Sequence, residues 1–498
     1  MKVLVITGKL AYPIVKEVVS GIKDVEVKAL DYPVAALMSV RYILEGIKDL
    51  KQKYDVVLIP GLASGDAREI QERLGVKAYK GTESAWDIPL VLEALRNGVE
   101  LSTVEPADSI IKELKERELE RIEESLEVNS KVAFEAGIKV PLYPPPFRIF
   151  LELDPNWDVE RIKEEVERTK DYVDVYVVGF PVGHHDLEEV RRKVKPVLDE
   201  GKVAGVDSES PRELIEGVKA GAAFAFNLNE LNVEKLQEVR RESAFVVAPF
   251  TTEDRGDVTI SLVKKAREMG FERLLADPVL SPPLQGLMDS LCEFKKVRKA
   301  LADVPMLMGI LNVTELIDAD SHGVNALMTA IAGELGVANL LVMEKGKTKW
   351  SSLETRIASK MVSMAMVQKK TPKDVGMDLL ILKDKRKVKE EEVKGEEVGY
   401  VPPSMDPSGF VKVSKAKDKL AVEFYGKKRI ALTGTDALSL GRRLVSEVNV
   451  TPQHALYIGY ELAKAEIALA LDKNYIQDEP LFKRVYASSG AKGNKGDS

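Results

Sequence analysis

Eight short apolar runs rich in β-branched residues follow one another between positions 149 and 343, and segments with helical periodicity separate them. Continuous apolar runs of this length are typical of strands buried on both faces, as in a parallel sheet. Eight alternating strands and helices in about two hundred residues predict a (β/α)8 TIM barrel. The runs are IFLEL from 149, VYVVG from 175, VAGVD from 203, AFAFN from 223, FVVAP from 245, RLLAD from 273, MLMGILN from 306 and NLLVM from 339.

Four of these runs end in a carboxylate or an amide. Asp207 ends the third run, Asn227 the fourth, Asp277 the sixth and Asn312 the seventh. In a TIM barrel the active site lies at the C-terminal ends of the strands, and a polar side chain there is partly buried and needs a partner. A single such residue is usually a helix cap or a loop contact. Four on one rim favour a ligand site.

The regions on either side of the barrel predict further domains. Residues 1–110 alternate strands and helices as in a Rossmann-like open sheet, with glycine-bearing loops at 7–8 and 60–66. Because neither GxGxxG nor a Walker loop is present, we interpret these loops as tight strand-to-helix turns. Residues 111–146 predict a charged helical and Pro-rich connector, with the helical pattern running from 109 to 136. The barrel is assigned to residues 147–371.

Residues 372–487 predict an α+β domain, and the polar, Gly-rich residues 488–498 predict a disordered tail. The domain is expected to contain a strand at DLLILK, a hairpin turning at 426–428 and a long helix capped by Thr451. Several conspicuous residues are interpreted as structural: Cys292 as a small buried residue, His184 and His185 as a solvated loop, His454 as a helix-start residue rather than a cobalt ligand, and Glu461, Lys464 and Glu466 as a solvated helix face.

Composition narrows the class of protein. A chain of 498 residues is too long for a single hydrophobic core and predicts several domains. Its 31% charged and 45% hydrophobic residues are typical of a soluble globular protein. No apolar run reaches the length of a membrane span, and the first residues lack a signal-peptide pattern. A single cysteine excludes an intrachain disulfide and a Cys-paired zinc site, and it fits the cytoplasm. The net charge of -7 argues against general nucleic-acid binding. No metal site is predicted.

The four rim residues suit a flat heterocycle that carries both donors and acceptors. A carboxylate accepts a bidentate pair from an amino-pyrimidinone edge, and an asparagine supplies one donor and one acceptor. A pterin ring displays such an edge.

The barrel sequence resembles the pterin-binding barrels, which include dihydropteroate synthases and methyltetrahydrofolate-type methyltransferases. The resembling segments are VAGVDSESPRELIEGVKAGAAFAFNLNE, RLLADPVLSPP and GILNVTELIDADSHGVNALMTAIAGELGVANLLVM. The resemblance implies that Asp207, Asn227 and Asp277 hold the pterin. With its extra domains at each end, the whole chain resembles the archaeal dihydropteroate synthase-related proteins.

The two branches of this family differ in the segments after strands one, seven and eight. Synthases carry NVTPDSF, SRK and RVHD, where this chain has ELDPNWD, ILNVTE and VMEKGK. Lys345, Lys347 and Arg148 are the cations left to bind an anionic second substrate. The segment from Gly309 to Thr314 resembles instead the methyltransferase pattern GLSNVS, whose asparagine contacts the pterin N5. Asn312 occupies that position.

The resemblance therefore implies an enzyme that transfers a methyl group from a reduced pterin of the tetrahydromethanopterin or tetrahydrofolate type. Asn312 and Asp277 are its expected catalytic residues. In that branch the acceptor is typically a corrinoid on a partner protein, and related barrels are often homodimers. One alternative is a dihydropteroate synthase-like condensation. The other is a non-catalytic pterin-binding scaffold.

Overall fold

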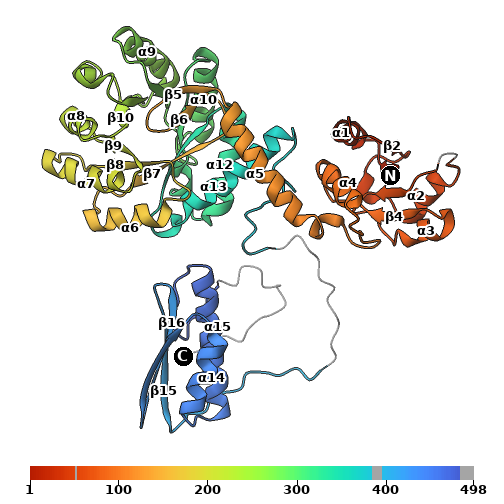
Figure 1. Cartoon of the computed structure of the whole chain (residues 1–498). Helices are drawn as coiled ribbons and strands as arrows, with labels where there is room; N and C mark the ends of the chain where they lie inside the picture. The colour runs from red at the N-terminus through yellow and green to blue at the C-terminus, as the bar shows by residue number, and fades with distance from the viewer. Residues whose placement is uncertain (51–52, 384–394, 483–498) are drawn as a thin grey trace. The chain divides into compact units, whose positions relative to one another are not determined.

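The computed structural model describes residues 1–50, 53–383 and 395–482 (Figure 1). The chain divides into two units, Met1–Lys385 and Arg386–Ser498. The first unit holds the N-terminal domain and the barrel. The segment after the barrel also belongs to it, because Val375 and Met377 pack with Met361 and Met364 of helix α13 (Ser351–Val367). The strand expected at 378–383 does not form, and its Leu380, Ile381 and Leu382 are exposed.

The N-terminal domain is an open parallel sheet in the order β2-β1-β3-β4. Its strands alternate with helices that leave one apolar cluster on each face of the sheet, so it is doubly wound. The short strand β4 was not predicted, because its KAYK sequence lacks an apolar run. The elements are β1 (Val3–Thr7), α1 (Tyr12–Val18), β2 (Val25–Ala29), α2 (Val40–Ile47), β3 (Val56–Ile59), α3 (Arg68–Leu74), β4 (Lys77–Lys80) and α4 (Ile88–Arg96).

The connector helix α5 (Lys112–Asn129) ends earlier than its charge pattern predicted. A hairpin of β5 (Val132–Glu135) and β6 (Lys139–Pro141) replaces its expected last turns. Ala136 and Val140 of this hairpin join an apolar cluster with Phe150 and Val175, which lie near the starts of two barrel strands. The spacing of apolar residues in VAFEA predicts a helix. The segment forms a hairpin instead because its apolar residues cover the N-terminal end of the barrel, a contact that local periodicity does not report.

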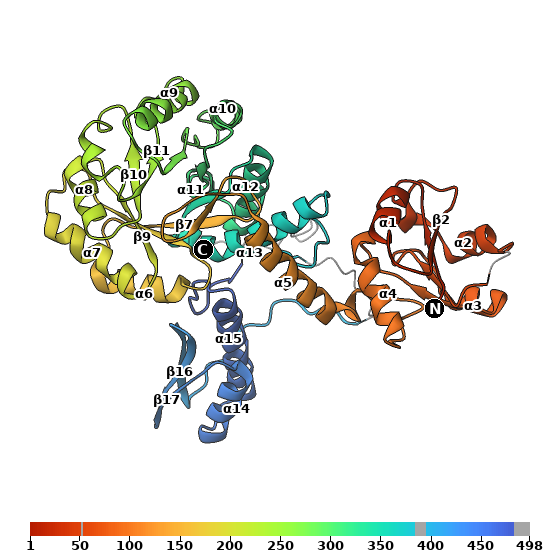
Figure 2. The same ribbon diagram turned by 45° about the horizontal axis from the view of Figure 1, so that its top comes forward.

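Eight parallel strands form the barrel, as predicted, in the order β12-β11-β10-β9-β8-β7-β14-β13. A bridge between Ala276 and Met306 joins the two ends of this order and closes the ring. Figure 2 shows helices α6 to α10 outside the strands. The strands are β7 (Arg148–Leu153), β8 (Val175–Gly179), β9 (Val203–Asp207), β10 (Phe224–Leu228), β11 (Ala244–Val247), β12 (Leu274–Ala276), β13 (Leu307–Gly309) and β14 (Asn339–Met343).

The barrel helices pack their apolar stripes on the outward side chains of these strands. Between β10 and β11 the connection holds only the short 3-10 helix η4 (Lys235–Val239), and one helical turn, α11 (Leu311–Thr314), follows β13. The remaining helices are α6 (Val159–Thr169), α7 (Leu187–Asp199), α8 (Pro211–Lys219), α9 (Arg255–Glu268), α10 (Leu287–Ala300) and α12 (Ser321–Leu335), followed by α13.

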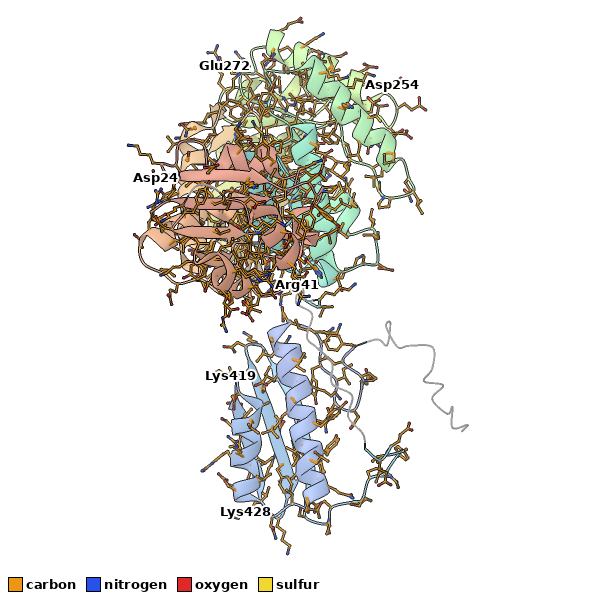
Figure 3. All side chains as sticks on the ribbon, turned by 90° about the vertical axis from the view of Figure 1, so that its right-hand side faces the viewer. Asp24, Arg41, Asp254, Glu272, Lys419 and Lys428 are labelled. Atoms are coloured by element: carbon orange, nitrogen blue, oxygen red, sulfur yellow. The ribbon has the colours of Figure 1, made fainter. Side chains whose placement is uncertain are left out.

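The C-terminal domain is an antiparallel sheet, β15 (Gly409–Ala416), β16 (Lys419–Gly426) and β17 (Arg429–Gly434), with helices α14 (Ala437–Glu447) and α15 (Pro452–Ala470). The hairpin forms at the predicted turn, and Figure 3 shows Lys419 and Lys428 at its opposite ends. Val422 and Phe424 on one sheet face pack with Leu462 of α15. Thr451 caps α15 as predicted, because its hydroxyl accepts a hydrogen bond from the His454 N–H.

Three side-chain environments differ from the sequence interpretation. Glu461 and Lys464 form a buried ion pair at 2.9 Å, to which Tyr475 adds a hydrogen bond, so this helix face is not solvated. Cys292 is exposed. His184 is held between the carboxylates of Glu189 and Glu213 and is largely buried. For Glu461 and His184 the difference depends on a contact farther along the chain, with Tyr475 and Glu213 respectively.

The predicted tail at 488–498 lies outside the described residues. Among the residues that are described, no helix is both long and apolar enough to cross a bilayer.

Helix α8 lies so close to β9 that Gly217 has no space for a side chain. A Cβ on Gly217 would lie 2.7–2.8 Å from three carbons of the buried Val206. We expect Gly217→Ala to lower the free energy of unfolding by about 1–3 kcal/mol, as overpacking does. Gly323→Ala is the control: its Cβ meets nothing within 4 Å, and the change should stabilise helix α12 by about 0.5–1 kcal/mol. Urea unfolding measures both, and equal effects would contradict the close contact.

Candidate functional site

The alternation of side chains along the barrel strands brings three carboxylates to the C-terminal rim. Phe150, Val203 and Leu275 face the barrel interior, and a strand returns to the same face at every second residue. Glu152, Asp207 and Asp277 therefore point inward at the ends of β7, β9 and β12. Gly179 of β8 aligns with Asp207 in register and adds no side chain beside it.

Burial brings the pKa values of two of these carboxyl groups close to neutral pH. The pKa of Asp207 is raised to about 7 because burial penalises the charged form, and the charge of Glu209 adds to the effect. Burial also raises the pKa of Asp277 to about 7, although the Val279 N–H, which donates to Asp277 Oδ1 at 2.8 Å, and the charge of Arg255 oppose the shift. Near pH 7 each group can therefore accept or release a proton.

Glu152 was not singled out in the sequence. Its pKa is raised to about 8, mainly by burial and also by the charges of Asp207, Glu315 and Asp154. Because the charges of Asp207 and Glu315 act on Glu152, these acids lie in one electrostatic cluster. A signal was present: Glu152 is the lone charged residue in the run IFLEL, at an inward position. Reading each run with a period of two would have found it.

Asn227 lies where strand β10 departs from regular pairing. The register of β10 with β11 shifts between Phe226 and Leu228, on either side of Asn227. The Asn227 carbonyl accepts a hydrogen bond from Asn232 Nδ2 at 2.8 Å, which ties this strand end to the following loop. Irregularities of this kind re-aim a side chain at the rim of a barrel.

Asn312 belongs to the turn α11 and not to the strand that precedes it, which ends at Gly309. Its Nδ2 donates a hydrogen bond of 2.8 Å to the carbonyl of Leu280. Leu280 lies in the loop that follows Asp277. The structure therefore connects Asn312 to the Asp277 loop, although 35 positions separate the two residues in the sequence.

The three cations considered for an anionic substrate are already engaged. Lys345 pairs with the buried Asp154 at 2.6 Å. Lys347 contacts the Ile317 carbonyl and the Asp318 carboxylate. Arg148 cannot reach the rim, because it begins β7 at the opposite end of the barrel and there forms a bidentate pair with Glu127.

Within the described part of the chain, no group of three or more His, Cys, Asp or Glu side chains is arranged to hold a metal ion. The rim thus consists of buried acids, two asparagines and lysines that carboxylates neutralise. Such a set can bind and orient a neutral polar heterocycle and can move a proton.

The fold defines the class: a (β/α)8 barrel with an added domain at each end. Residues 1–83 match a family of unknown function, DUF6513, and residues 405–478 match a family described as PterinBD-DUF4346. An uncharacterized protein of Methanocaldococcus jannaschii, MJ0107, is 31% identical over 533 aligned positions, which cover 97% of this chain and 99% of that protein. The chain belongs to the family of this archaeal protein. The resemblance of the whole chain to archaeal proteins, stated from the sequence, is thereby confirmed.

A solved dihydropteroate synthase of Yersinia pestis, bound to a pterine-sulfa conjugate, is 14% identical. It aligns with 48% of this chain and 100% of its own, with a TM-score of 0.37. The barrel assignment rests on the strand order and its closure rather than on this distant likeness.

The raised pKa of Asp277 predicts a dependence of stability on pH. A carboxyl group whose pKa is about 7 in the folded state and 3.8 in its ordinary, solvated state favours the folded state at low pH, and that advantage is lost as pH rises from about 4 to about 7. Asp277→Asn cannot ionise. Its free energy of unfolding, relative to the unmodified protein, should therefore increase by roughly 1–4 kcal/mol between pH 4 and pH 8.

Urea unfolding at several pH values measures this difference. Asp289→Asn, at an exposed position in the first turn of α10, reports the effect of removing a solvated carboxylate. A difference for Asp277→Asn that is the same at pH 4 and pH 8 would contradict the burial argument.

Proposed function

We propose that this chain is a pterin-binding enzyme that transfers the methyl group of an N5-methyl tetrahydropterin to an acceptor carried by a partner protein, such as a corrinoid. The observation that carries the proposal is the rim geometry. Two inward carboxylates, Asp207 and Asp277, have pKa values of about 7, and Asn312 is hydrogen-bonded to the loop that follows one of them. The name of the family matched by residues 405–478 also supports a pterin ligand.

Ring recognition falls to the buried carboxylates and Asn227. An ionised carboxylate accepts the ring N–H and exocyclic amino group as a bidentate pair. These bonds favour the charged form of a carboxyl group whose pKa burial has raised. Pterin binding therefore draws a proton off the carboxyl group that accepts this pair, which we assign to Asp207.

Methyl transfer requires a proton at N5. The acceptor nucleophile attacks the methyl carbon, the N5–CH3 bond breaks, and N5 retains the electron pair and takes up a proton. Asn312 uses one amide N–H on the Leu280 carbonyl, which leaves its second N–H and its carbonyl oxygen for N5. Asp277, with a pKa of about 7, is suited to supply the proton through water.

The charge distribution supports methyl transfer over condensation with a pterin diphosphate. A departing diphosphate needs preorganised positive charge. On this rim Lys345 is paired with Asp154, and Glu152 and Glu315 add further carboxylates whose pKa values burial raises. An anionic leaving group would face these acids, whereas a methyl donor carries no comparable charge at N5.

Two substitutions should distinguish pterin binding from the methyl-transfer step. We expect Asp207→Asn to weaken binding of an N5-methyl tetrahydropterin by about tenfold to a hundredfold, as the loss of a charged hydrogen-bond acceptor does. Asn312→Ala should change the binding constant little and slow methyl transfer by about a hundredfold or more. Titration calorimetry and single-turnover transfer to a corrinoid measure these effects.

Asn97→Ala, at an exposed position after helix α4, is the control. Pterin diphosphate is the competing ligand. Tighter binding of the diphosphate, weakened by Lys345→Ala, would contradict methyl transfer and support condensation.

Proton linkage provides an independent measurement. At pH 6, Asp207 in the free protein is mostly protonated because its pKa is about 7, and bonding to the ring should ionise it. Binding is thus expected to release protons, and the observed enthalpy should change with the ionisation enthalpy of the buffer. The release should fall in Asp207→Asn and persist in Asp289→Asn. Proton uptake on binding would overturn this assignment.

A further inference from the structure

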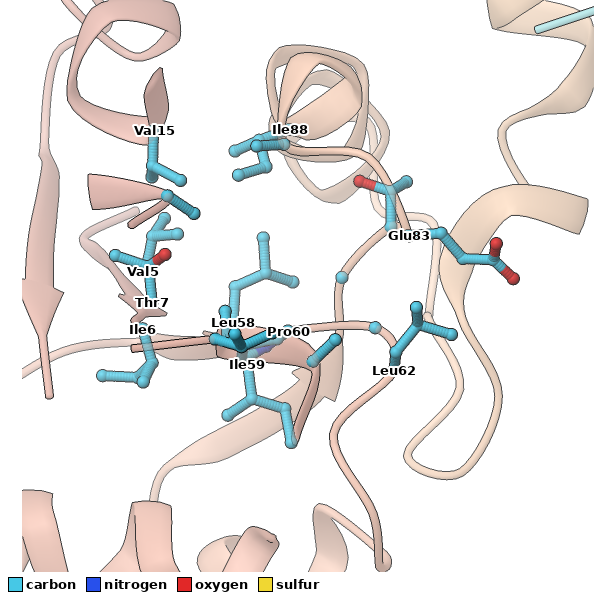
Figure 4. A pocket seen from close by; sticks show the side chains of 18 of the residues that line it. Val5, Ile6, Thr7, Val15, Leu58, Ile59, Pro60, Leu62, Glu83 and Ile88 are labelled. Atoms are coloured by element: carbon cyan, nitrogen blue, oxygen red, sulfur yellow. The ribbon is translucent and has the colours of Figure 1, made fainter. Parts of the chain in front are cut away.

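A cavity of about 250 Å³ lies in the N-terminal domain, at the C-terminal ends of β1, β3 and β4 (Figure 4). In the order β2-β1-β3-β4 the chain leaves β1 for β2 on one side and returns to β3 on the other. The connections after β1 and β3 therefore diverge between these two neighbours. Doubly wound sheets bind ligands at this topological switch point.

Apolar side chains from different elements face one another across this cavity. Val5 of β1 and Leu58 of β3 lie on the sheet, and Val15 of α1 and Ile88 of α4 approach from the helices, as Figure 4 shows. A slot between aliphatic side chains suits a flat ring, which buries both of its faces there.

The loops at the rim of the cavity pack backbone against backbone. A Cβ on Gly61 would lie 2.5 Å from the Gly81 carbonyl oxygen, and a Cβ on Gly81 would lie 3.0 Å from the Ile59 carbonyl oxygen. These glycines make tight turns, as the sequence indicated. The structure adds that both of them line the cavity, and that their N–H groups donate to the Thr82 and Ile59 carbonyls, which holds the two loops together.

The polar groups of the lining favour an uncharged ligand over an anionic one. Glu83 is the one ionisable side chain among the described residues that line the cavity, and its carboxylate points away from Val5 and Leu58 in Figure 4. Thr7 and Thr82 are buried. The Thr82 hydroxyl donates to the Ser84 carbonyl at 2.7 Å and keeps its lone pairs for a donor on the ligand. Among the residues that the structure describes, no lysine, arginine or histidine lines this space to compensate a phosphate.

We propose that the N-terminal domain binds an uncharged heteroaromatic molecule, with a ring of the nucleobase or isoalloxazine type, in this cavity. Apolar side chains cover the ring faces, and the threonine hydroxyls meet its polar edge. The site is separate from the barrel rim and is independent of the function proposed for it.

The test uses the full chain with four probes: adenosine, riboflavin and their phosphate esters AMP and FMN. We expect saturable 1:1 binding of at least one uncharged probe, at least as tight as that of its ester. Fluorescence quenching reports the flavins and titration calorimetry the nucleosides. Failure of both uncharged probes to bind up to their solubility limits, or a tenfold preference for an ester, would overturn the proposal.

Matched variants locate the binding. Ala36 lines the cavity, whereas its neighbour Leu37 is exposed and does not. Ala36→Phe should weaken binding of the responding probe by at least roughly tenfold, and Leu37→Phe should leave it unchanged. Ala85→Leu, a smaller change in the lining, tests the same point should the phenylalanine disturb folding.

Asp207→Asn distinguishes this site from the barrel. Probe binding should persist in that variant, whatever its effect on pterin binding. Loss of probe binding in Asp207→Asn, or its persistence in both Ala36→Phe and Ala85→Leu, would overturn the proposal.

Discussion

Side chains on a closed parallel sheet alternate between the barrel interior and the surrounding helices, and this alternation determines the candidate site. Phe150 and Val175 fill the interior. At the rim, the inward positions of β7, β9 and β12 are occupied by Glu152, Asp207 and Asp277. Closure of the sheet between Ala276 and Met306 brings the last of these onto the same ring as the first two. A shift of one residue in any strand would turn its acid outward.

Burial of these acids raises their pKa values and makes their ionised forms unfavourable for stability. The pKa values of Asp207, Asp277 and Glu152 lie between about 7 and about 8 because ionisation there is penalised. Perturbed groups that gather at one end of a barrel are characteristic of functional sites, since a fold gains no stability from them. A ligand that donates hydrogen bonds relieves the penalty, which links binding to proton release.

The flanking domains obey the same physical rules with different results. In the N-terminal domain the strand order creates a switch point, and glycines at the loop contacts keep its rim narrow. In the C-terminal domain a buried Glu461–Lys464 pair is held in place by Tyr475. Removing one partner of such a pair leaves an uncompensated buried charge, so the pair favours one packing of helix α15 over others.

Local sequence determined the repeating strands, the open-sheet domain, the hairpin at 426–428 and the Thr451 cap, because periodicity and capping act over a few residues. It also identified the strand ends that carry Asp207, Asn227 and Asp277. Only the tertiary structure decided that VAFEA covers the barrel as a hairpin, that Arg148 lies at the wrong end, that Glu152 joins the acids and that Lys345 is neutralised by Asp154. These depend on burial and on charges brought together across the ring, and no local pattern of residues encodes such contacts.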